Sequence, residues 1–302
     1  MKARIYSLII KTWQHIPFKK QIIFLLKQMN LSFEKYIKDL WFNGKFKVNI
    51  LDTSFYLYSN RIDKGMFEIY YEGIDKCWDA NSIIIWGKLC KKSQNIFDIG
   101  ANFGLYSMVA KAVNPEANVY SFEPSKFAFD LINKNLKINN FNINVFDFAI
   151  SNTNGSKTFF ESEKSSAASS FVVQETQQNS FSTREVITHT FKNFIDQHDI
   201  KTIDLISIDV ESYESEVLEG MENIISEFLP NFIIEVLNNE LGKKIEKYFA
   251  NKNYLYYEIN EKDMTVMLRD NLYRVDENRY HSYNFLICTL ETASYLKLET
   301  PN

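Results

Sequence analysis

The sequence predicts an α/β fold, built on a doubly wound, mostly parallel sheet. Short apolar runs that favour strands alternate with segments whose apolar residues recur at i, i+3, i+4 and i+7, the spacing of one helical face. This alternation is typical of parallel sheets, because parallel strands need long crossover connections that are usually helical. The clearest unit covers residues 95–113, where a strand, a turn of small residues and a helix follow one another directly.

The stretch Asn95–Gly104, NIFDIGANFG, is the centre of the prediction. Its apolar run ends in an acid, Asp98, and the turn that follows contains Gly100, Asn102 and Gly104. A strand, a glycine turn and a helix in this order open a nucleotide-binding βαβ unit, where backbone amides at the helix start meet the ligand.

The residues before this stretch, 1–94, are predicted to form an N-terminal extension, and residues 95–302 the α/β domain. Residues 1–33 hold six basic side chains and no acid, in a chain of net charge −4. Such basic, amphipathic helices either pack on the domain or lie on an anionic membrane surface, and both alternatives stay open. Residues 46–58 predict a small hairpin, and Phe67–Trp86 predict a helix with an aromatic face.

Beyond the turn, each further apolar run predicts a strand of the sheet. The expected strands are Asn118–Phe122, Ile143–Phe146, Ile203–Val210, Phe232–Val236, 254–259, 264–268 and Asn284–Leu290. Helices are expected after Pro124, through Val217–Phe228 and over 239–250. The polar stretch 150–183, rich in serine, interrupts the alternation and is either a binding loop or a flexible excursion.

Composition narrows the class of protein. The net charge of −4 argues against nucleic acid as a partner, because phosphate binding requires a basic surface. Three cysteines without a CxxC pair suggest reduced thiols, as in a cytoplasmic protein. No apolar run approaches the roughly 20 residues of a membrane span. We therefore expect a cytoplasmic protein, with peripheral contact at the inner face of the membrane through residues 1–33 as the alternative.

The strand ends predict the ligand. In open α/β sheets ligands bind outside the carboxyl ends of the strands. Those ends carry acids in this chain: Asp98, Glu123, Asp147, Asp209, Glu211 and Glu235. Carboxylates suit an amino group, a sulfonium cation and a ribose diol, and suit a pyrophosphate poorly. The turn also lacks the GxGxxG pattern of dinucleotide folds, because Asn102 stands where a second glycine is expected. These features favour S-adenosylmethionine over NAD, whose oxidoreductases remain the rival class of enzyme.

Five ordered motifs resemble the FkbM-type methyltransferases: FDIGANFGLYS, VYSFEPSKFAFDLINKNLKINN, FDFAISNTNGS, IDLISIDVESYESEVLEG and FIIEV. The resemblance covers residues 95–290 and implies a Rossmann-like class I fold with a seven-stranded sheet. It implies that Asp98, Gly100, Asn102 and Gly104 hold the methionine part of S-adenosylmethionine and Glu123 the ribose. By the same resemblance Asp147, Phe148 and Ala149 flank the adenine. One departure is Ser212, where the family usually has glycine.

The expected activity is O-methylation, for which the acceptor hydroxyl must lose its proton to a nearby base. Asp209 and Glu211 are the candidates, because they stand at the carboxyl end of a central strand; His281 is a weaker one. The residues leave Mg²⁺ binding by Asp209, Glu211 and Glu235 open as an alternative, but our prediction contains no metal.

By resemblance, the acceptor is a sugar hydroxyl of a surface glycan or its precursor. The alternatives are a small-molecule natural product, or a non-catalytic cofactor-binding scaffold subunit of a glycan assembly complex. The sequence does not predict the oligomeric state.

Overall fold

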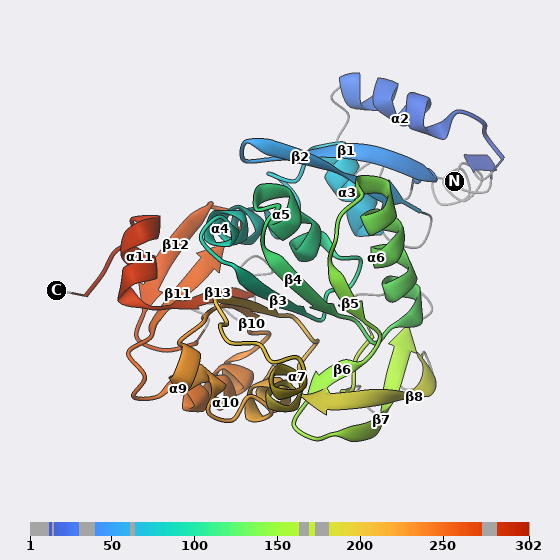
Figure 1. The fold of residues 1–302 in the computed structure, drawn as a ribbon. Helices are drawn as coiled ribbons and strands as arrows, with labels where there is room; N and C mark the ends of the chain where they lie inside the picture. The colour runs from blue at the N-terminus through green and yellow to red at the C-terminus, as the bar shows by residue number, and fades with distance from the viewer. Residues whose placement is uncertain are drawn as a thin grey trace.

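The computed structural model describes residues 12–13, 15–29, 40–60, 64–162, 169–172, 181–273 and 283–301. The main sheet is built from β3 (Asn95–Ile99), β4 (Asn118–Phe122), β5 (Asn144–Phe146), β9 (Leu205–Ile208), β10 (Asn231–Glu235), β11 (Leu255–Asn260), β12 (Thr265–Arg269) and β13 (Asn284–Cys288). Their order is β12-β11-β13-β10-β9-β3-β4-β5. Helices cover both faces of the sheet (Figure 1), which confirms the predicted α/β fold.

The direction of the strands divides the sheet in two. From β5 to β10 all neighbours are parallel, whereas β13, β11 and β12 join through antiparallel pairs. The described sheet has eight strands, as many as the apolar runs predict, so the number of seven that the family resemblance implies is wrong. The eighth is β12 at the edge, paired with β11 from Tyr256↔Arg269 to Asn260↔Thr265. The apolar run at 264–268 predicts this short strand of the sheet.

Alternate side chains of the parallel strands point to opposite faces, as the pleat requires. Ile96, Val119 and Leu205 join the core under α4 (Ala80–Cys90), α5 (Leu105–Val113) and α6 (Lys126–Asn139). Phe97, Phe122 and Ile206 join the core of the other face. That face is covered by α7 (Phe191–Gln197), α8 (Glu214–Glu219), α9 (Ile224–Phe228) and α10 (Asn239–Phe249). The helix α11 (Leu290–Leu296) follows the last strand.

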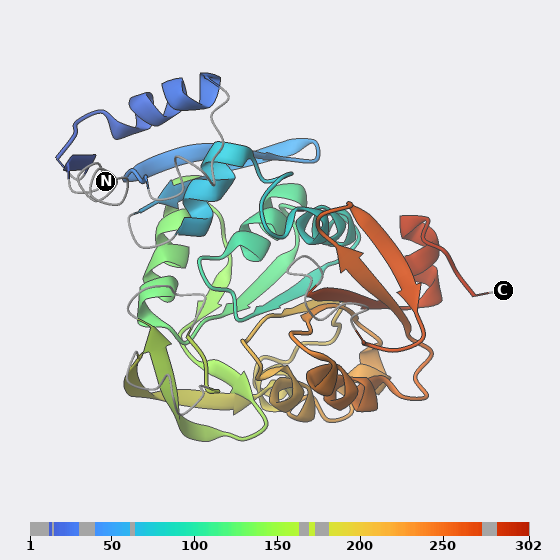
Figure 2. The same cartoon turned by 180° about the vertical axis from the view of Figure 1, so that it is seen from behind.

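The N-terminal part lies over one face of the domain (Figure 2). It consists of α2 (Lys19–Gln28), the hairpin β1 (Gly44–Ile50) and β2 (Thr53–Ser59), and α3 (Lys64–Glu72). The hairpin was predicted, and α6 holds it: Asn135 Oδ1 accepts from Tyr58 N at 2.9 Å, and Asn139 Oδ1 from Tyr56 N at 2.7 Å. The boundary at residue 94 stays a prediction.

Two predicted helices are wrong in extent. The helix expected over 67–86 is divided, because Gly73 adopts φ 106° and the chain turns before α4 begins. The helix expected over 217–228 is divided between α8 and α9 at Gly220. A Cβ atom on Gly220 would lie 2.0 Å from the carbonyl oxygen of Ser151. The carbonyl oxygen of Gly220 accepts a hydrogen bond from Lys192 N. A left-handed glycine in the first case and a close backbone contact of a glycine in the second override the apolar periodicity.

A second, three-stranded sheet flanks the domain. It has the order β6-β8-β7, from β6 (Ala149–Ser151), β7 (Gly155–Ser162) and β8 (Phe181–Thr190). Of the serine-rich loop between β7 and β8, residues 163–168 and 173–180 lie outside the described part. In the part of the chain that the structure describes, no helix is long and apolar enough to cross a membrane.

Candidate active site

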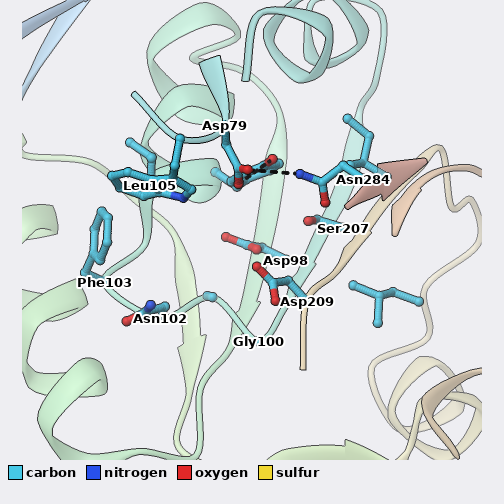
Figure 3. Close-up of a pocket in the computed structure, with 14 residues that line it drawn as sticks. Asp79, Asp98, Gly100, Asn102, Phe103, Leu105, Ser207, Asp209 and Asn284 are labelled. Atoms are coloured by element: carbon cyan, nitrogen blue, oxygen red, sulfur yellow. Dashed lines mark hydrogen bonds between the residues drawn. The ribbon is translucent and has the colours of Figure 1, made fainter. Parts of the chain in front are cut away.

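A cavity of about 60 Å³ lies at the carboxyl ends of β3, β9 and β10. Its volume corresponds to roughly four water molecules, so it can enclose one end of a nucleoside ligand rather than the whole. Its polar lining comprises Asp79, Asp98, Asn102, Ser207, Asp209 and Asn284 (Figure 3). Among the residues that the structure describes, no lysine, arginine or histidine lines it. The cavity therefore favours cations and hydrogen-bond donors.

The glycine turn forms the floor of this cavity. Gly100 has φ 83°, and a Cβ atom there would lie 1.8 Å from the carbonyl oxygen of Asp209. The N–H groups of Gly100 and Ala101 both donate to the carbonyl of Phe122, at 3.0 and 3.1 Å. Asn102 has φ 48°, a left-handed conformation that asparagine tolerates better than most residues. The turn is thus fixed against both β4 and β9.

Asp98 is the penultimate residue of β3 and is buried. Its Oδ2 accepts from the backbone N–H of Ser107 at 2.9 Å and from the Ser107 hydroxyl at 2.5 Å. Burial raises the pKa of Asp98 to about 7, against the effect of these hydrogen bonds. One carboxyl oxygen thus anchors the start of α5, and the residue still lines the cavity.

Glu123 ends β4 and binds the turn rather than lining the cavity. Its Oε2 accepts from Asn102 N at 2.7 Å and its Oε1 from Ser125 N at 2.7 Å. Burial raises the pKa of Glu123 to about 7. The structure therefore gives this residue a direct role in holding the turn, and ribose binding stays a prediction.

Asp209 follows β9, is exposed to solvent and lines the cavity. Desolvation of its carboxyl group by the surrounding protein raises the pKa of Asp209 to about 6. A side-chain hydrogen bond from Glu235 acts in the opposite direction and lowers this pKa. The pKa of Glu235, at the end of β10, is raised well above its ordinary value by burial and by the neighbouring Asp209. In this pair Glu235 keeps the proton and Asp209 is the stronger acid.

The turn after β9 carries Glu211 and Ser212, whose φ angles are 54° and 77°. Two consecutive left-handed residues other than glycine are unusual and persist only where the surroundings impose them. Glu214 Oε1 accepts from Val210 N at 3.1 Å and from Ser212 N at 3.3 Å, and Ser170 donates to the carbonyl of Glu211 at 2.8 Å. Burial raises the pKa of Glu211 to about 8.

Only some of the predicted site residues therefore lie together in the structure. Asp98, Gly100, Asn102 and Asp209 line one cavity, and Gly104, at φ 84°, directly precedes α5. Asp147, Phe148 and Ala149 follow β5 and do not line it. Asp147 is exposed, Ala149 is buried, and the Phe148 ring packs 4.6 Å from that of His189. Their role beside an adenine stays a prediction. His281 lies outside the described residues.

The sequence reasoning missed the wall of the cavity opposite the turn. Trp78, Asp79, Tyr106 and Asn284 contribute to it. Asp79 and Asn284 are 205 positions apart, and Asn284 Nδ2 donates to Asp79 Oδ1 at 3.1 Å (Figure 3). No local signal indicates Asp79, because it stands inside the helix that the sequence predicts over 67–86.

In the described ranges no group of three or more His, Cys, Asp or Glu side chains is arranged to hold a metal ion. The acids of the cavity instead pair with amides, hydroxyls and one another.

The model of the family "Methyltransferase FkbM domain" matches residues 98–256, more than half of the chain. "Methyltransferase sdnD" of Sordaria araneosa is 26% identical over 209 residues, which are 60% of this chain and 78% of that protein. "Hexuronic acid methyltransferase AglP" of Haloferax volcanii is 24% identical over 139 residues, 46% of this chain and 54% of that protein.

Among solved structures, methyltransferase FkbM from Methylobacillus flagellatus KT aligns with a TM-score of 0.43 at 14% identity, over 65% of this chain and 43% of that one. A putative S-adenosylmethionine-dependent methyltransferase from Streptococcus mutans aligns with a TM-score of 0.42 at 12% identity, over 80% and 54%. This chain thus spans about half of these solved chains. The family match is the finding that decides the class: the chain belongs to the FkbM methyltransferase domain family and is a methyltransferase.

Proposed function

We propose that the protein is an S-adenosylmethionine-dependent O-methyltransferase that acts on a sugar hydroxyl of a surface glycan or its precursor. The single observation that carries the proposal is the cavity at the carboxyl ends of β3 and β9. It is lined by Asp79, Asp98 and Asp209, and by no basic side chain among the described residues. Because S-adenosylmethionine carries an ammonium and a sulfonium group, the side chains of this cavity fit it.

The cofactor site is proposed at the glycine turn. Asp98, Gly100, Asn102 and Gly104 would hold the methionine part, and Glu123 would hold the ribose next to them. When bound, the cofactor supplies a methyl group on a positively charged sulfur. Gly100 lets the backbone of the turn approach closely, since its φ of 83° and its contact with Asp209 leave no room for a side chain.

Asp209 is the proposed general base. An attacking hydroxyl must give up its proton, and a carboxylate with a pKa of about 6 is ionised at pH 7 while still basic enough to accept it. Glu235, which keeps its own proton, donates to Asp209 and holds the carboxylate in place. Glu211, whose pKa is about 8, is the second candidate.

The sugar acceptor has two supports. A relative is named as a hexuronic acid methyltransferase. The Trp78 side chain, 40% exposed, lines the cavity and packs edge-on against Phe103, so it offers a flat apolar surface of the kind that the face of a sugar ring can cover. A small-molecule natural product remains the alternative acceptor, because a shared fold does not fix the substrate.

Peripheral membrane contact is a separate proposal about residues 1–33, of which the structure describes 12–13 and 15–29. In α2, Phe24 and Leu25 are more than half exposed. Lys20 and Lys27 instead turn inward and donate to the carbonyls of Lys45 and Tyr70. Deleting residues 1–33 should reduce binding to anionic liposomes; unchanged binding would contradict it.

The function is tested with methyl-labelled S-adenosylmethionine, offered together with extracted envelope glycans and, separately, with cell metabolites. Mass spectrometry then identifies what gains a methyl group. Label in a glycan or its precursor supports the sugar acceptor, and label in a small metabolite supports the alternative. Binding of the cofactor without label in any pool would indicate a scaffold subunit.

A further inference from the structure

Asp79 stands directly before α4, at the position where an aspartate ordinarily caps the helix. There its side chain would accept a hydrogen bond from the backbone N–H two or three residues further on. Asp79 makes no such bond. Its carboxyl group lines the cavity instead (Figure 3).

The reason is that Glu261 takes over the cap. This residue follows β11, and its Oε2 accepts from Asn81 N at 2.6 Å. Its Oε1 accepts from Ser82 N at 3.1 Å and also from the Ser82 hydroxyl. The amides that Asp79 would bind are therefore already satisfied by a residue distant in the sequence, so the helix does not need the Asp79 carboxyl group.

The Asp79 carboxyl group itself accepts hydrogen bonds from only two of the described residues. Asn284 Nδ2 donates at 3.1 Å, and the Tyr106 hydroxyl lies at 3.5 Å, the long limit of a hydrogen bond. A carboxylate offers about four acceptor positions. Burial and the nearby Glu261 and Asp209 raise the pKa of Asp79 well above its ordinary value. A cation with several donor hydrogens would complete this environment.

The other two acids of the cavity are more fully engaged. Asp98 is held by Ser107 through two hydrogen bonds, and Asp209 pairs with Glu235. Asp79 lines the same cavity as Gly100 and Asn102, where the methionine end of the cofactor is proposed to lie. Of the groups at that end, the α-amino group is the cation with three donor hydrogens.

We propose that Asp79 is an additional cofactor-binding residue, which holds the α-amino group of the methionine part of S-adenosylmethionine. This inference rests on the proposed function, because it adds a residue to the cofactor site. It also assigns a role to Glu261, which by capping α4 leaves Asp79 available to the ligand.

The test compares two ligands on Asp79→Asn. S-Adenosylhomocysteine contains the amino group, whereas 5′-methylthioadenosine keeps the adenosine and the thioether but lacks the amino acid. Titration calorimetry should show S-adenosylhomocysteine weakened by about tenfold or more, because charged hydrogen bonds are the strong ones. Binding of 5′-methylthioadenosine should stay within about twofold, and it also reports that the site is folded. The matched control is Asp75→Asn, an exposed aspartate of the same segment, which should leave both affinities unchanged.

Three results would overturn the assignment. Equal weakening of both ligands would show that Asp79 only supports the structure. Unchanged S-adenosylhomocysteine affinity with a raised KM for the acceptor would place Asp79 on the acceptor side. If Asp79→Asn does not fold, Asp79→Glu keeps the charge, and it should bind S-adenosylhomocysteine selectively more weakly. Failure of the wild-type protein to bind S-adenosylhomocysteine at all would instead overturn the proposed function, and this inference with it.

Discussion

Glu123 binds the backbone N–H of Asn102 through Oε2 at 2.7 Å, so the acid at the end of β4 holds the turn at the end of β3. Its other oxygen binds Ser125 N, at the start of α6. One carboxyl group therefore joins two strand-to-helix connections. Both connections border the proposed cofactor site.

This relationship predicts that Glu123→Gln destabilises the protein. An amide has one acceptor oxygen, so one of the two N–H groups loses its partner, at a cost of about 1–3 kcal/mol. Denaturant unfolding measures the loss, and S-adenosylmethionine affinity should fall with it. Glu116→Gln, at an exposed glutamate, is the control and should change neither. Full stability in Glu123→Gln would show that the two amides do not depend on the carboxylate.

Asp209→Asn should remove turnover while leaving cofactor binding intact. An asparagine cannot accept the proton of the acceptor hydroxyl, so kcat should fall by about 10²- to 10⁴-fold. Steady-state kinetics and S-adenosylhomocysteine titration separate the two effects. Asp199→Asn, at an exposed aspartate outside the cavity, should keep wild-type kcat. A kcat within a few fold of wild type would exclude Asp209 as the base.

Four acids predict that the unliganded protein loses stability as the pH rises. Burial raises the pKa of Asp98 and Glu123 to about 7 and that of Glu211 and Glu214 to about 8. Between the unfolded pKa near 4 and these values, the folded state binds more protons than the unfolded state. The stabilisation is complete below about pH 4 and is lost through pH 7–8.

Other carboxyl groups titrate at acidic pH, so Tm should be measured at higher pH, where their titration does not contribute. Tm should fall between about pH 5.5 and 8. Glu214→Gln keeps an acceptor for the amides of Val210 and Ser212 but does not titrate, so it should reduce the slope. A Tm that rises across this range would contradict the prediction.

Gly100→Ala should be among the most destabilising single changes in the chain. Its Cβ would meet the Asp209 carbonyl oxygen at 1.8 Å, in addition to the strain of φ 83°. We expect a loss of more than about 3 kcal/mol, or no folded protein. Gly155→Ala separates the two causes, because φ is 147° there and nothing lies within 4 Å. Similar losses in both variants would mean that strain alone matters.

Ser212→Gly should be neutral or stabilising. Relief of the left-handed conformation, worth about 1–2 kcal/mol, exceeds or offsets the entropy cost of glycine, about 0.5–1 kcal/mol. The same change at Ser215, inside α8, should destabilise by up to about 1 kcal/mol. Equilibrium unfolding of the two variants shows whether each change raises or lowers the free energy of unfolding. Loss of stability in Ser212→Gly would indicate that its side chain makes contacts that the φ angle does not show.

The parts of the site that follow from the sequence are local. The turn 98–104 and the acid after each parallel strand lie within a few residues of a readable pattern, so their place at the sheet edge could be predicted. The break at Gly73 could not, because it depends on a left-handed φ, and the break at Gly220 could not, because a contact with the distant backbone of Ser151 decides it. Asp79 was missed for the same reason. Its release from α4 depends on Glu261, some 180 positions away, and no local pattern indicates that a cap has been replaced.

The hydrogen bonds between α4 and Glu261 have a consequence for the order in which the protein folds. Asn81 N binds Glu261 across 180 positions, and Asp79 binds Asn284 across 205. Contacts between residues so far apart in the sequence form late in folding, because the long chain segment between them must first lose conformational entropy. A chain that has already formed the strand and turn at 95–104 would still lack one wall of the cavity. Ligand binding during refolding would therefore report the docking of the C-terminal strands, rather than formation of the nucleotide turn.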